Sequence, residues 1–165
     1  ILNSDDLFCD ESAIQQVMSI FDKEDLDSVY ADIYYVQQDD TNKIVRTWTT
    51  GEKKGFRKGW HPAHPTFYVK KKIYEEYGKF NLKFKLAADF EIMLRFLEKY
   101  RISTAYLKKP LIKMRLGGET NKSLKNILKQ NIECVKAFKY NGLPVNGLFY
   151  PLTRILPKLL QFGKR

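Results

Sequence analysis

Cysteines, histidines and long apolar runs are all scarce in this sequence. Its 165 residues include two histidines and two cysteines, Cys9 and Cys134, which stand far apart with no CxxC pair. Zinc centres and disulfide frameworks need several closely spaced cysteines or histidines, so neither is indicated. No segment approaches the roughly 20 consecutive apolar residues that a membrane-spanning helix needs. No signal peptide opens the chain, so a cytoplasmic protein is the default expectation.

The residues that are present have the composition of a globular domain. Hydrophobic residues make up 44% of the chain and charged residues 29%, which excludes a disordered or collagen-like segment. Position 1 is Ile rather than Met, and the apolar pair Ile1-Leu2 leads directly into Asn3. We therefore expect a fragment or a processed chain.

Charge is divided unevenly along the chain, whose net charge is +10. Residues 1–40 hold eleven Asp or Glu and one Lys, a net of −10, so the remaining residues carry +20. A strongly basic region suits an anionic partner, which could be nucleic acid, acidic lipid headgroups or the diphosphate of a sugar donor. The alternative is a solvated basic face that only keeps the protein soluble.

Four segments have the three-to-four-residue apolar spacing of amphipathic helices. The first follows Asp10, an expected N-cap; the second covers 71–77 and stops at Gly78; the third opens at Asp89; the fourth runs from Ser123 to the stop signal at 141–142. The expected inward-facing residues are Ile14, Val17, Met18 and Phe21, then Phe90, Met93, Leu94 and Leu97, then Leu124, Ile127, Leu128, Ile132, Val135 and Phe138.

Extended segments alternate with these helices. Residues 28–36 and 44–50 are rich in β-branched and aromatic residues and predict a hairpin or two neighbouring strands. A short strand is expected at 66–69, and 102–115 reads as extended chain interrupted by Pro110. The glycine-punctuated, basic stretch 51–59 predicts a loop. The pattern indicates one α/β unit with a mixed arrangement of strands and helices.

Adjacent carboxylates near the start of the chain are the first candidates for chemistry. Asp5 and Asp6 follow a short apolar segment, and open α/β sheets bind ligands at the carboxyl ends of strands. Mg²⁺ and Mn²⁺ prefer carboxylate and phosphate oxygens. Neighbours on an extended chain point to opposite faces, so of these two metal candidates we assign Asp6 to the metal and Asp5 to the nucleoside or a structural hydrogen bond. The alternative is a turn that caps the following helix.

Several motifs resemble bacterial glycosyltransferase family 2 enzymes, and they occur in the same order. They are Ile-Leu-Asn-Ser-Asp-Asp-Leu-Phe at 1–8, Val-Tyr-Ala-Asp-Ile-Tyr-Tyr-Val at 29–36, His64-Pro-Thr-Phe67, Tyr77-Gly-Lys-Phe80, Ala88-Asp89-Phe90-Glu91 and Lys113-Met-Arg-Leu-Gly-Gly118. Their order and spacing over about 120 residues are more specific than any single motif.

This resemblance implies a metal-dependent, inverting enzyme with the GT-A fold, which moves a sugar from a nucleotide-sugar donor to a glycan or lipid-linked acceptor, in surface polysaccharide synthesis. It also implies that the nucleoside-binding strands, roughly the first ninety residues of such an enzyme, are absent. We expect a partial GT-A-like mixed sheet with the metal motif and acceptor-binding part at 1–142. A basic, apolar and helical extension is expected at 143–165.

Asp89 matches the position of the family's catalytic base. In an inverting transferase this carboxylate takes the proton of the acceptor hydroxyl while a cation stabilises the departing diphosphate. Relatives usually carry an acid before the base, but this sequence has Ala88 there, and Glu91 would face elsewhere on a helix. The alternative role for Asp89 is that of a helix N-cap.

The resemblance also implies further contacts to donor and acceptor. Arg115, with the turn at Gly117-Gly118, could bind the donor diphosphate through its guanidinium and backbone N–H groups. His64 would lie near the acceptor pocket, and Trp60 could offer an apolar face to a sugar ring or could belong to the core. His61 and His64 are separated by proline and do not have metal-ligand spacing.

Two functions other than glycosyl transfer remain open from the sequence. The basic region with interleaved aromatic residues could bind nucleic acid, although no zinc-finger spacing or RNA-binding aromatic motif is present. Residues 145–165 combine apolar bulk with cations in the manner of an interfacial membrane helix. The second property is compatible with an enzyme that builds lipid-linked glycans at the inner face of the membrane.

Overall fold

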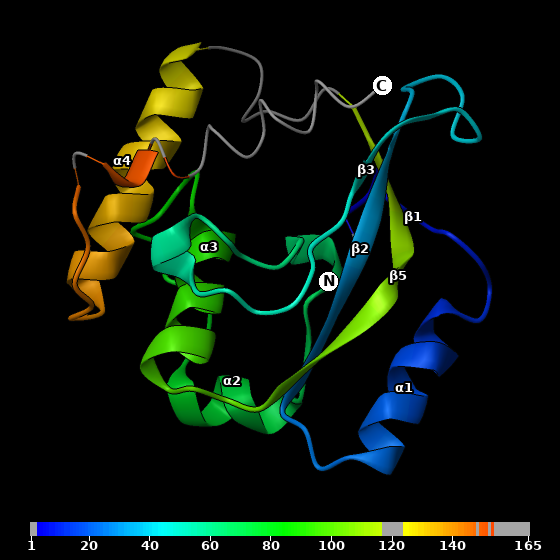
Figure 1. Ribbon diagram of the computed structural model, residues 1–165, viewed down its shortest axis with the longest axis horizontal. Helices are drawn as coiled ribbons and strands as arrows, with labels where there is room; N and C mark the ends of the chain where they lie inside the picture. Colours follow the sequence, from blue (N-terminus) through cyan, green and yellow to red (C-terminus); the bar gives the residue numbers. More distant parts are fainter. Residues whose placement is uncertain (1–2, 117–123, 148, 152, 154–165) are drawn as a thin grey trace.

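The computed structural model describes residues 3–116, 124–147, 149–151 and 153. These residues form a mixed β-sheet with helices on both faces (Figure 1). The predicted α/β class is therefore confirmed. Gly117, Gly118, Ser123 and residues 154–165 of the expected extension lie outside the described residues.

The sheet is built around β2 (Ser28–Val36), whose predicted bounds are confirmed. This strand pairs in parallel with β5 (Thr104–Arg115) and antiparallel with β3 (Ile44–Trp48), which completes the predicted hairpin. The short strand β1 (Leu7–Phe8) pairs antiparallel with β5, and β4 (Tyr68–Val69) pairs with the start of β2. The order β1-β5-β2-β3 places the two parallel strands at the centre.

Pro110 lies inside β5 without ending the strand. Opposite Pro110, the register between β2 and β5 shifts on both sides of Asp32. Such an irregularity accommodates a residue that has no backbone N–H to donate to the ladder. The expected interruption is thus a local bulge in one continuous strand.

Of the helices that the structure describes, α1 (Ala13–Lys23) covers one face of the sheet (Figure 1). Ala13 and Val17 are buried against the sheet, whereas Ile14 and Met18 are 44% and 49% exposed. The prediction that Ile14 and Met18 face inward was wrong. α1 makes its main contacts with β2 and β5, and the stripe of the helix that these strands cover is set one residue earlier than expected.

Asp10 does not cap α1 as predicted. The N-cap position is held by Ser12, and the Asp10 carboxylate instead accepts hydrogen bonds from the Ser12 amide at 2.9 Å and hydroxyl at 2.6 Å. Asp10 also pairs with Lys109 of β5 at 3.0 Å. The bond from the Ser12 hydroxyl, followed by that from Lys109, lowers the pKa of Asp10 to about 2.

The other face carries α2 (Lys71–Tyr77), α3 (Ala88–Leu94), the π-helical turn η3 (Arg95–Lys99) and α4 (Leu124–Tyr140) (Figure 1). The predicted helix at 71–77 is confirmed, and Gly78 follows it with φ 87°. All four inward-facing residues predicted for the third helix are buried.

On α4, Leu128 and Ile132 are 63% and 46% exposed, so the prediction that both face inward was wrong. The stripe that packs inward holds Cys134, Ala137 and Phe138. Tyr150 is buried against this same cluster, which means that the described start of the C-terminal extension packs onto the domain. Among the described residues, no helix is long and apolar enough to cross a bilayer.

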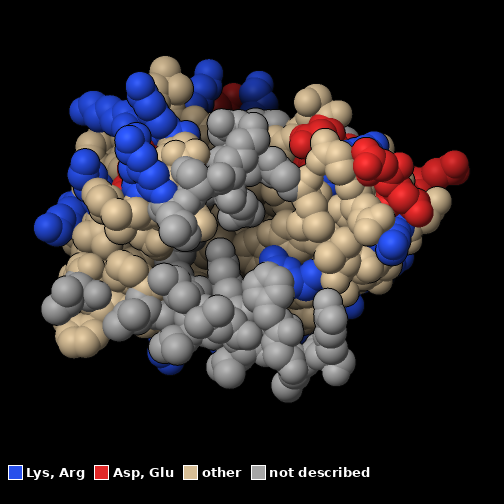
Figure 2. All heavy atoms as spheres, turned by 90° about the horizontal axis from the view of Figure 1, so that it is seen from above, with Lys and Arg blue, Asp and Glu red and all other residues tan. Residues whose placement is uncertain are grey.

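The uneven charge of the sequence persists on the folded surface. Seen from above, Figure 2 shows a large group of Lys and Arg at the upper left, and most of the Asp and Glu at the upper right with some Lys and Arg among and below them. The upper left of this face is therefore the part best suited to attract an anionic ligand.

Candidate functional site

A pocket of about 550 Å³ opens between the N-terminal segment, the short 3₁₀ helix η2 (His64–Thr66) and the start of α3. Its volume is within the usual range for small-molecule sites. The polar side chains that line it are Asn3, Asp5, His64, Lys85 and Asp89, and the apolar ones include Phe67, Tyr74, Phe80, Ile92, Met93 and Met114. Three motifs far apart in sequence thus contribute to one cavity.

Asp5 and Asp6 occupy different environments, as neighbouring residues of an extended chain should. Asp5 is exposed and lines the pocket. Asp6 is 4% exposed, and its Oδ2 accepts a hydrogen bond from Asn3 Nδ2 at 2.8 Å. Burial raises the pKa of Asp6, and the bond from Asn3 opposes that rise. Asp5 thus reaches the pocket and Asp6 is turned inward; the expected assignment of Asp6 to the metal stays a prediction.

The short apolar segment expected to lead into the acidic motif, Ile1-Leu2, lies outside the described residues. Within the described residues the motif precedes the strand β1. The antiparallel pairing of Leu7 with Lys113 nevertheless sets the motif beside the carboxyl end of β5. Met114, near that end, lines the same pocket. The site therefore lies where open α/β sheets bind ligands.

His64 and Asp89 both line the pocket, and their side chains lie close together. His64 Nδ1 lies 3.4 Å from Asp89 Oδ2. Thr66 fixes the position of η2, because its hydroxyl bonds to the carbonyl oxygens of Ala31 and Ala63 at 2.9 and 2.8 Å. The imidazole is thereby tied to the central strand of the sheet, and its side chain remains about one-third exposed.

Asp89 lies in the first turn of α3 and is not its N-cap, a position held by Ala87. Asp89 Oδ1 accepts a hydrogen bond from the Phe90 amide at 2.8 Å, and the side chain is 37% exposed. One carboxylate oxygen is thus held by backbone, while the other faces His64. The side chain is fixed in orientation and open to a ligand.

Glu91 faces away from this pocket, as the helical spacing predicted. It is fully buried, and its Oε1 accepts hydrogen bonds from Arg95 Nε at 3.1 Å and Asn141 Nδ2 at 3.0 Å. Arg95 also donates to the carbonyl oxygens of Tyr77, at short distance, and Lys79 at 2.7 Å. This network ties α3, the end of α2 and the end of α4 together behind the pocket.

The segment that leads into α3 is held by α4. Glu133 Oε2 accepts hydrogen bonds from the amides of Leu86 and Ala87 at 2.8 and 3.0 Å, and Gln130 donates to the Leu86 carbonyl at 3.3 Å. Sequence reasoning missed Glu133, since nothing local marks a helical Glu as the partner of a loop 46 residues earlier. It also missed Lys85, a cation at the pocket wall whose proximity to Asp89 in the sequence was the available signal.

Arg115 makes contacts with backbone. Its Nε donates to the Asp5 carbonyl at 3.2 Å, and Nη1 donates to the Gln38 carbonyl. These bonds fasten the acidic motif to the end of β5. The diphosphate contact expected of Arg115 stays a prediction, and Gly117 and Gly118 lie outside the described residues.

Trp60 lies in the core and does not line the pocket. It is 9% exposed, its ring meets those of Tyr30 and Phe56 edge to face, and its Nε1 donates to the Thr50 carbonyl at 2.9 Å. Of the two open roles for this residue, the geometry supports the core. A sugar ring would have to displace packed side chains to reach it.

A divalent cation at this site would depend on the ligand for most of its coordination. Among the described residues, no three His, Cys, Asp or Glu side chains are grouped closely enough to hold a metal ion by themselves. The Asp5 carboxylate lines the pocket without a described hydrogen-bond or ion-pair partner. Such a carboxylate fits Mg²⁺ or Mn²⁺, which are often held by one or two protein carboxylates plus substrate phosphates.

Comparisons with protein-family models, with curated proteins and with solved structures gave no significant match. We therefore infer the function from the chemistry and geometry of the site. Asp5, His64 and Asp89 come from three separate segments and line the same pocket.

Proposed function

We propose that this chain carries the acceptor-side part of an inverting nucleotide-sugar glycosyltransferase, of family 2 and with a GT-A-like fold. The observation that carries the proposal is that Asp5, His64 and Asp89 line a single pocket. The motifs that resemble the family in the sequence supply these same three residues. Glycosyl transfer needs a carboxylate base, an acidic cation ligand and an acceptor surface together, and the pocket has a candidate for each.

Asp89 is the candidate base. The acceptor hydroxyl oxygen attacks the anomeric carbon, its proton passes to the free oxygen of Asp89, and the bond from the anomeric carbon to the diphosphate oxygen breaks. A single displacement inverts that carbon. His64, with Nδ1 3.4 Å from Asp89 Oδ2, holds the carboxylate in place and can contact the acceptor.

The donor diphosphate is assigned to the other side of the pocket. Asp5 would hold the Mg²⁺ or Mn²⁺ ion, and Lys85 offers a cation to a phosphate oxygen. The metal ion, when bound, neutralises charge that develops on the leaving diphosphate. Arg115 acts indirectly in this arrangement, because it holds the Asp5 backbone.

The acceptor is proposed to be a glycan or a lipid-linked saccharide, with surface polysaccharide synthesis at the inner face of the membrane as the setting. Aromatic side chains on the pocket wall support this class. Phe67, Tyr74 and Phe80 line the pocket, and aromatic rings pack well against the apolar faces of sugars.

The test compares Asp89→Asn with the wild type in the full-length gene product. Transfer from a panel of nucleotide-sugars is measured with Mn²⁺ present, and donor binding is measured by calorimetry. Asp89→Asn is expected to lower transfer by about 10²-fold or more, the usual contribution of a general base, while donor affinity is unchanged.

Asp25→Asn serves as the control, because Asp25 is an exposed acid that does not line the pocket. Wild-type turnover by Asp89→Asn would eliminate the base assignment. Retention of nucleic acid through high salt, with no effect of any nucleotide-sugar, would favour the nucleic-acid-binding alternative.

A further inference from the structure

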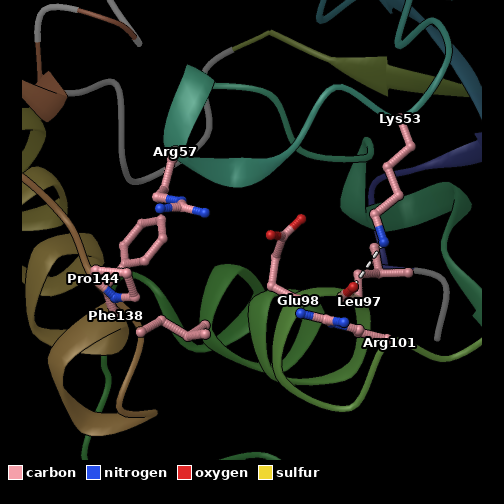
Figure 3. Close-up of a pocket in the computed structure, with 8 residues that line it drawn as sticks. Lys53, Arg57, Leu97, Glu98, Arg101, Phe138 and Pro144 are labelled. Atoms are coloured by element: carbon pink, nitrogen blue, oxygen red, sulfur yellow. Dashed lines mark hydrogen bonds between the residues drawn. The ribbon is translucent and has the colours of Figure 1, made fainter.

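A second cavity, of about 470 Å³, lies at the far end of the helix that begins near Asp89 (Figure 3). Its wall carries the cations Lys53, Arg57 and Arg101 and the acid Glu98. It shares no lining residue with the pocket of Asp89. Glu98 follows Asp89 by nine helical residues, which corresponds to about 14 Å along the helix axis. The cavity is therefore a distinct site.

Two guanidinium groups in this cavity have no partner among the residues that the structure describes. Among the described residues, neither Arg57 nor Arg101 has a side-chain hydrogen bond or ion pair. Figure 3 shows the charged ends of Arg57, Arg101 and Glu98 facing one space, while Lys53 donates to the Leu97 carbonyl at 2.7 Å. Three cations against one carboxylate leave an excess of positive charge that suits an anion.

Arg101 is held in an unfavourable backbone conformation. Its φ is 53°, and it is the only described residue other than glycine with positive φ. It follows the π-helical turn η3, at the position where a glycine would end the helix without steric cost. π-helical turns and residues other than glycine with positive φ are both frequent at functional sites.

Arg57 is presented by an anchored loop. The neighbouring Phe56 is fully buried, and the loop is tied at its start by a hydrogen bond from Tyr30 Oη to the Gly51 carbonyl at 3.1 Å. Trp60 Nε1 bonds to the Thr50 carbonyl at 2.9 Å and closes the loop at its end. The backbone position of Arg57 is therefore set before any ligand binds, so no loop has to be ordered on binding.

The remaining wall of the cavity is apolar. Phe138, Leu143 and Pro144 line it, and Figure 3 shows Phe138 and Pro144 on the same side as Arg57, across from Glu98 and Arg101. We infer that this cavity binds a phosphoryl group between the guanidinium groups of Arg57 and Arg101, on a ligand whose apolar part contacts this wall. The planar donor fork of arginine matches phosphate oxygens, and the excess charge matches a phosphate dianion. Glu98 accepts a hydrogen bond from a ligand hydroxyl.

The first experiment uses inorganic phosphate as the probe and follows the arginine Nε–H signals by NMR. Phosphate is expected to shift the signals of Arg57 and Arg101. Arg101→Gly is the decisive variant, because glycine relieves the backbone conformation. It should melt no lower than the wild type and bind phosphate at least about tenfold more weakly, a loss typical for one charged hydrogen-bonding partner.

Lys58→Gln is the matched control, since Lys58 is an exposed cation in the same loop that does not line the cavity. It should bind phosphate like the wild type, whereas Arg57→Gln should weaken binding as Arg101→Gly does. Wild-type phosphate affinity in Arg101→Gly, or the absence of any shift at Arg57 and Arg101, would overturn the inference.

A second experiment separates two sources of the phosphoryl group. Wild-type chain and Arg101→Gly are floated with phosphatidylcholine vesicles, with and without phosphatidic acid. Flotation that needs phosphatidic acid and is lost in Arg101→Gly identifies a lipid headgroup as the ligand. Phosphate binding without flotation identifies a soluble phosphate ester. If neither phosphate binding nor flotation is observed, the phosphoryl site is overturned, while the proposed transfer at Asp89 is unaffected.

Discussion

The Glu133 carboxylate on α4 accepts a hydrogen bond from the Ala87 amide at 3.0 Å, across 46 positions of sequence. Ala87 is the N-cap of α3, where backbone N–H groups lack partners within the helix. The same Glu133 oxygen accepts a bond from Leu86 at 2.8 Å. The start of α3, and with it the orientation of Asp89, therefore depends on α4.

Glu133→Ala is expected to lower the free energy of unfolding by about 1–3 kcal/mol, because it leaves two partly buried amides without an acceptor. It should also reduce glycosyl transfer. Glu133→Gln retains a carbonyl oxygen and should recover most of both losses. Lys136→Ala, an exposed change on the same helix, is the control for urea denaturation. Equal stability of Glu133→Ala and wild type would contradict the assigned role.

Arg95→Met should be strongly destabilising. It leaves the Glu91 carboxylate, 0% exposed, without its ionic partner, and breaking one side of a buried pair costs about 3–5 kcal/mol. Lys71→Met removes a pair of the same i,i+4 spacing, Lys71 with Glu75, that is exposed on both sides. That change should cost about 0.5 kcal/mol or less. Chemical denaturation measures both, and similar losses would refute the distinction.

The buried carboxyl group of Asp6 should make stability depend on pH. Burial raises its pKa above 3.8, the value for an unfolded chain. The folded protein therefore binds the proton more tightly, and the contribution of Asp6 to stability falls as pH rises from 3.8 through the raised pKa. Asp6→Asn cannot ionise, so it should melt higher than the wild type at neutral pH.

That advantage of Asp6→Asn should shrink as the pH is lowered towards 3.8. Asp39→Asn removes an exposed acid and controls for net charge. Melting temperatures over the pH range provide the comparison. A constant difference between Asp6→Asn and wild type at every pH would show that ionisation of Asp6 is not the cause.

Asp5 rather than Asp6 should control the response to divalent cations. Asp5 lines the pocket, whereas the Asp6 carboxylate is buried and bonded to Asn3. In the full-length gene product, Asp5→Asn is expected to weaken Mn²⁺-dependent donor binding by about tenfold or more, because one of few protein ligands is lost. Asp6→Asn should have a smaller effect. Calorimetric titration with and without Mn²⁺ distinguishes them, and the reverse order would restore Asp6 as the metal ligand.

Local sequence patterns predicted where helices and strands occur better than they predicted which side of each helix is buried. The strand at Ser28–Val36 and the helix at Lys71–Tyr77 were predicted with their bounds, because their composition and the following Gly78 act within the segment itself. The exposed faces of α1 and α4 were not predicted. Ile14 and Leu128 have the right period, but which stripe is buried depends on what the rest of the chain places against it.

In the candidate site, too, some residues could be predicted from local motifs and others could not. His64 and Asp89 were identified from the sequence through motifs, and the structure sets them 3.4 Å apart. Glu133 and the backbone contacts of Arg115 were missed, since each acts on a residue of another segment. Long-range pairs of this kind leave no periodic signal in a single sequence.

By itself, the sequence determined the α/β class, the uneven charge and the types of side chain available for chemistry. Composition and periodicity fix these properties locally. Only the tertiary structure decided that Asp5 lines the pocket while Asp6 is buried, that Trp60 belongs to the core, and that Arg57 and Arg101 share a second cavity. The reason is physical: burial and proximity depend on how strands and helices distant in sequence pack, because the free energy of burying apolar surface belongs to the whole fold.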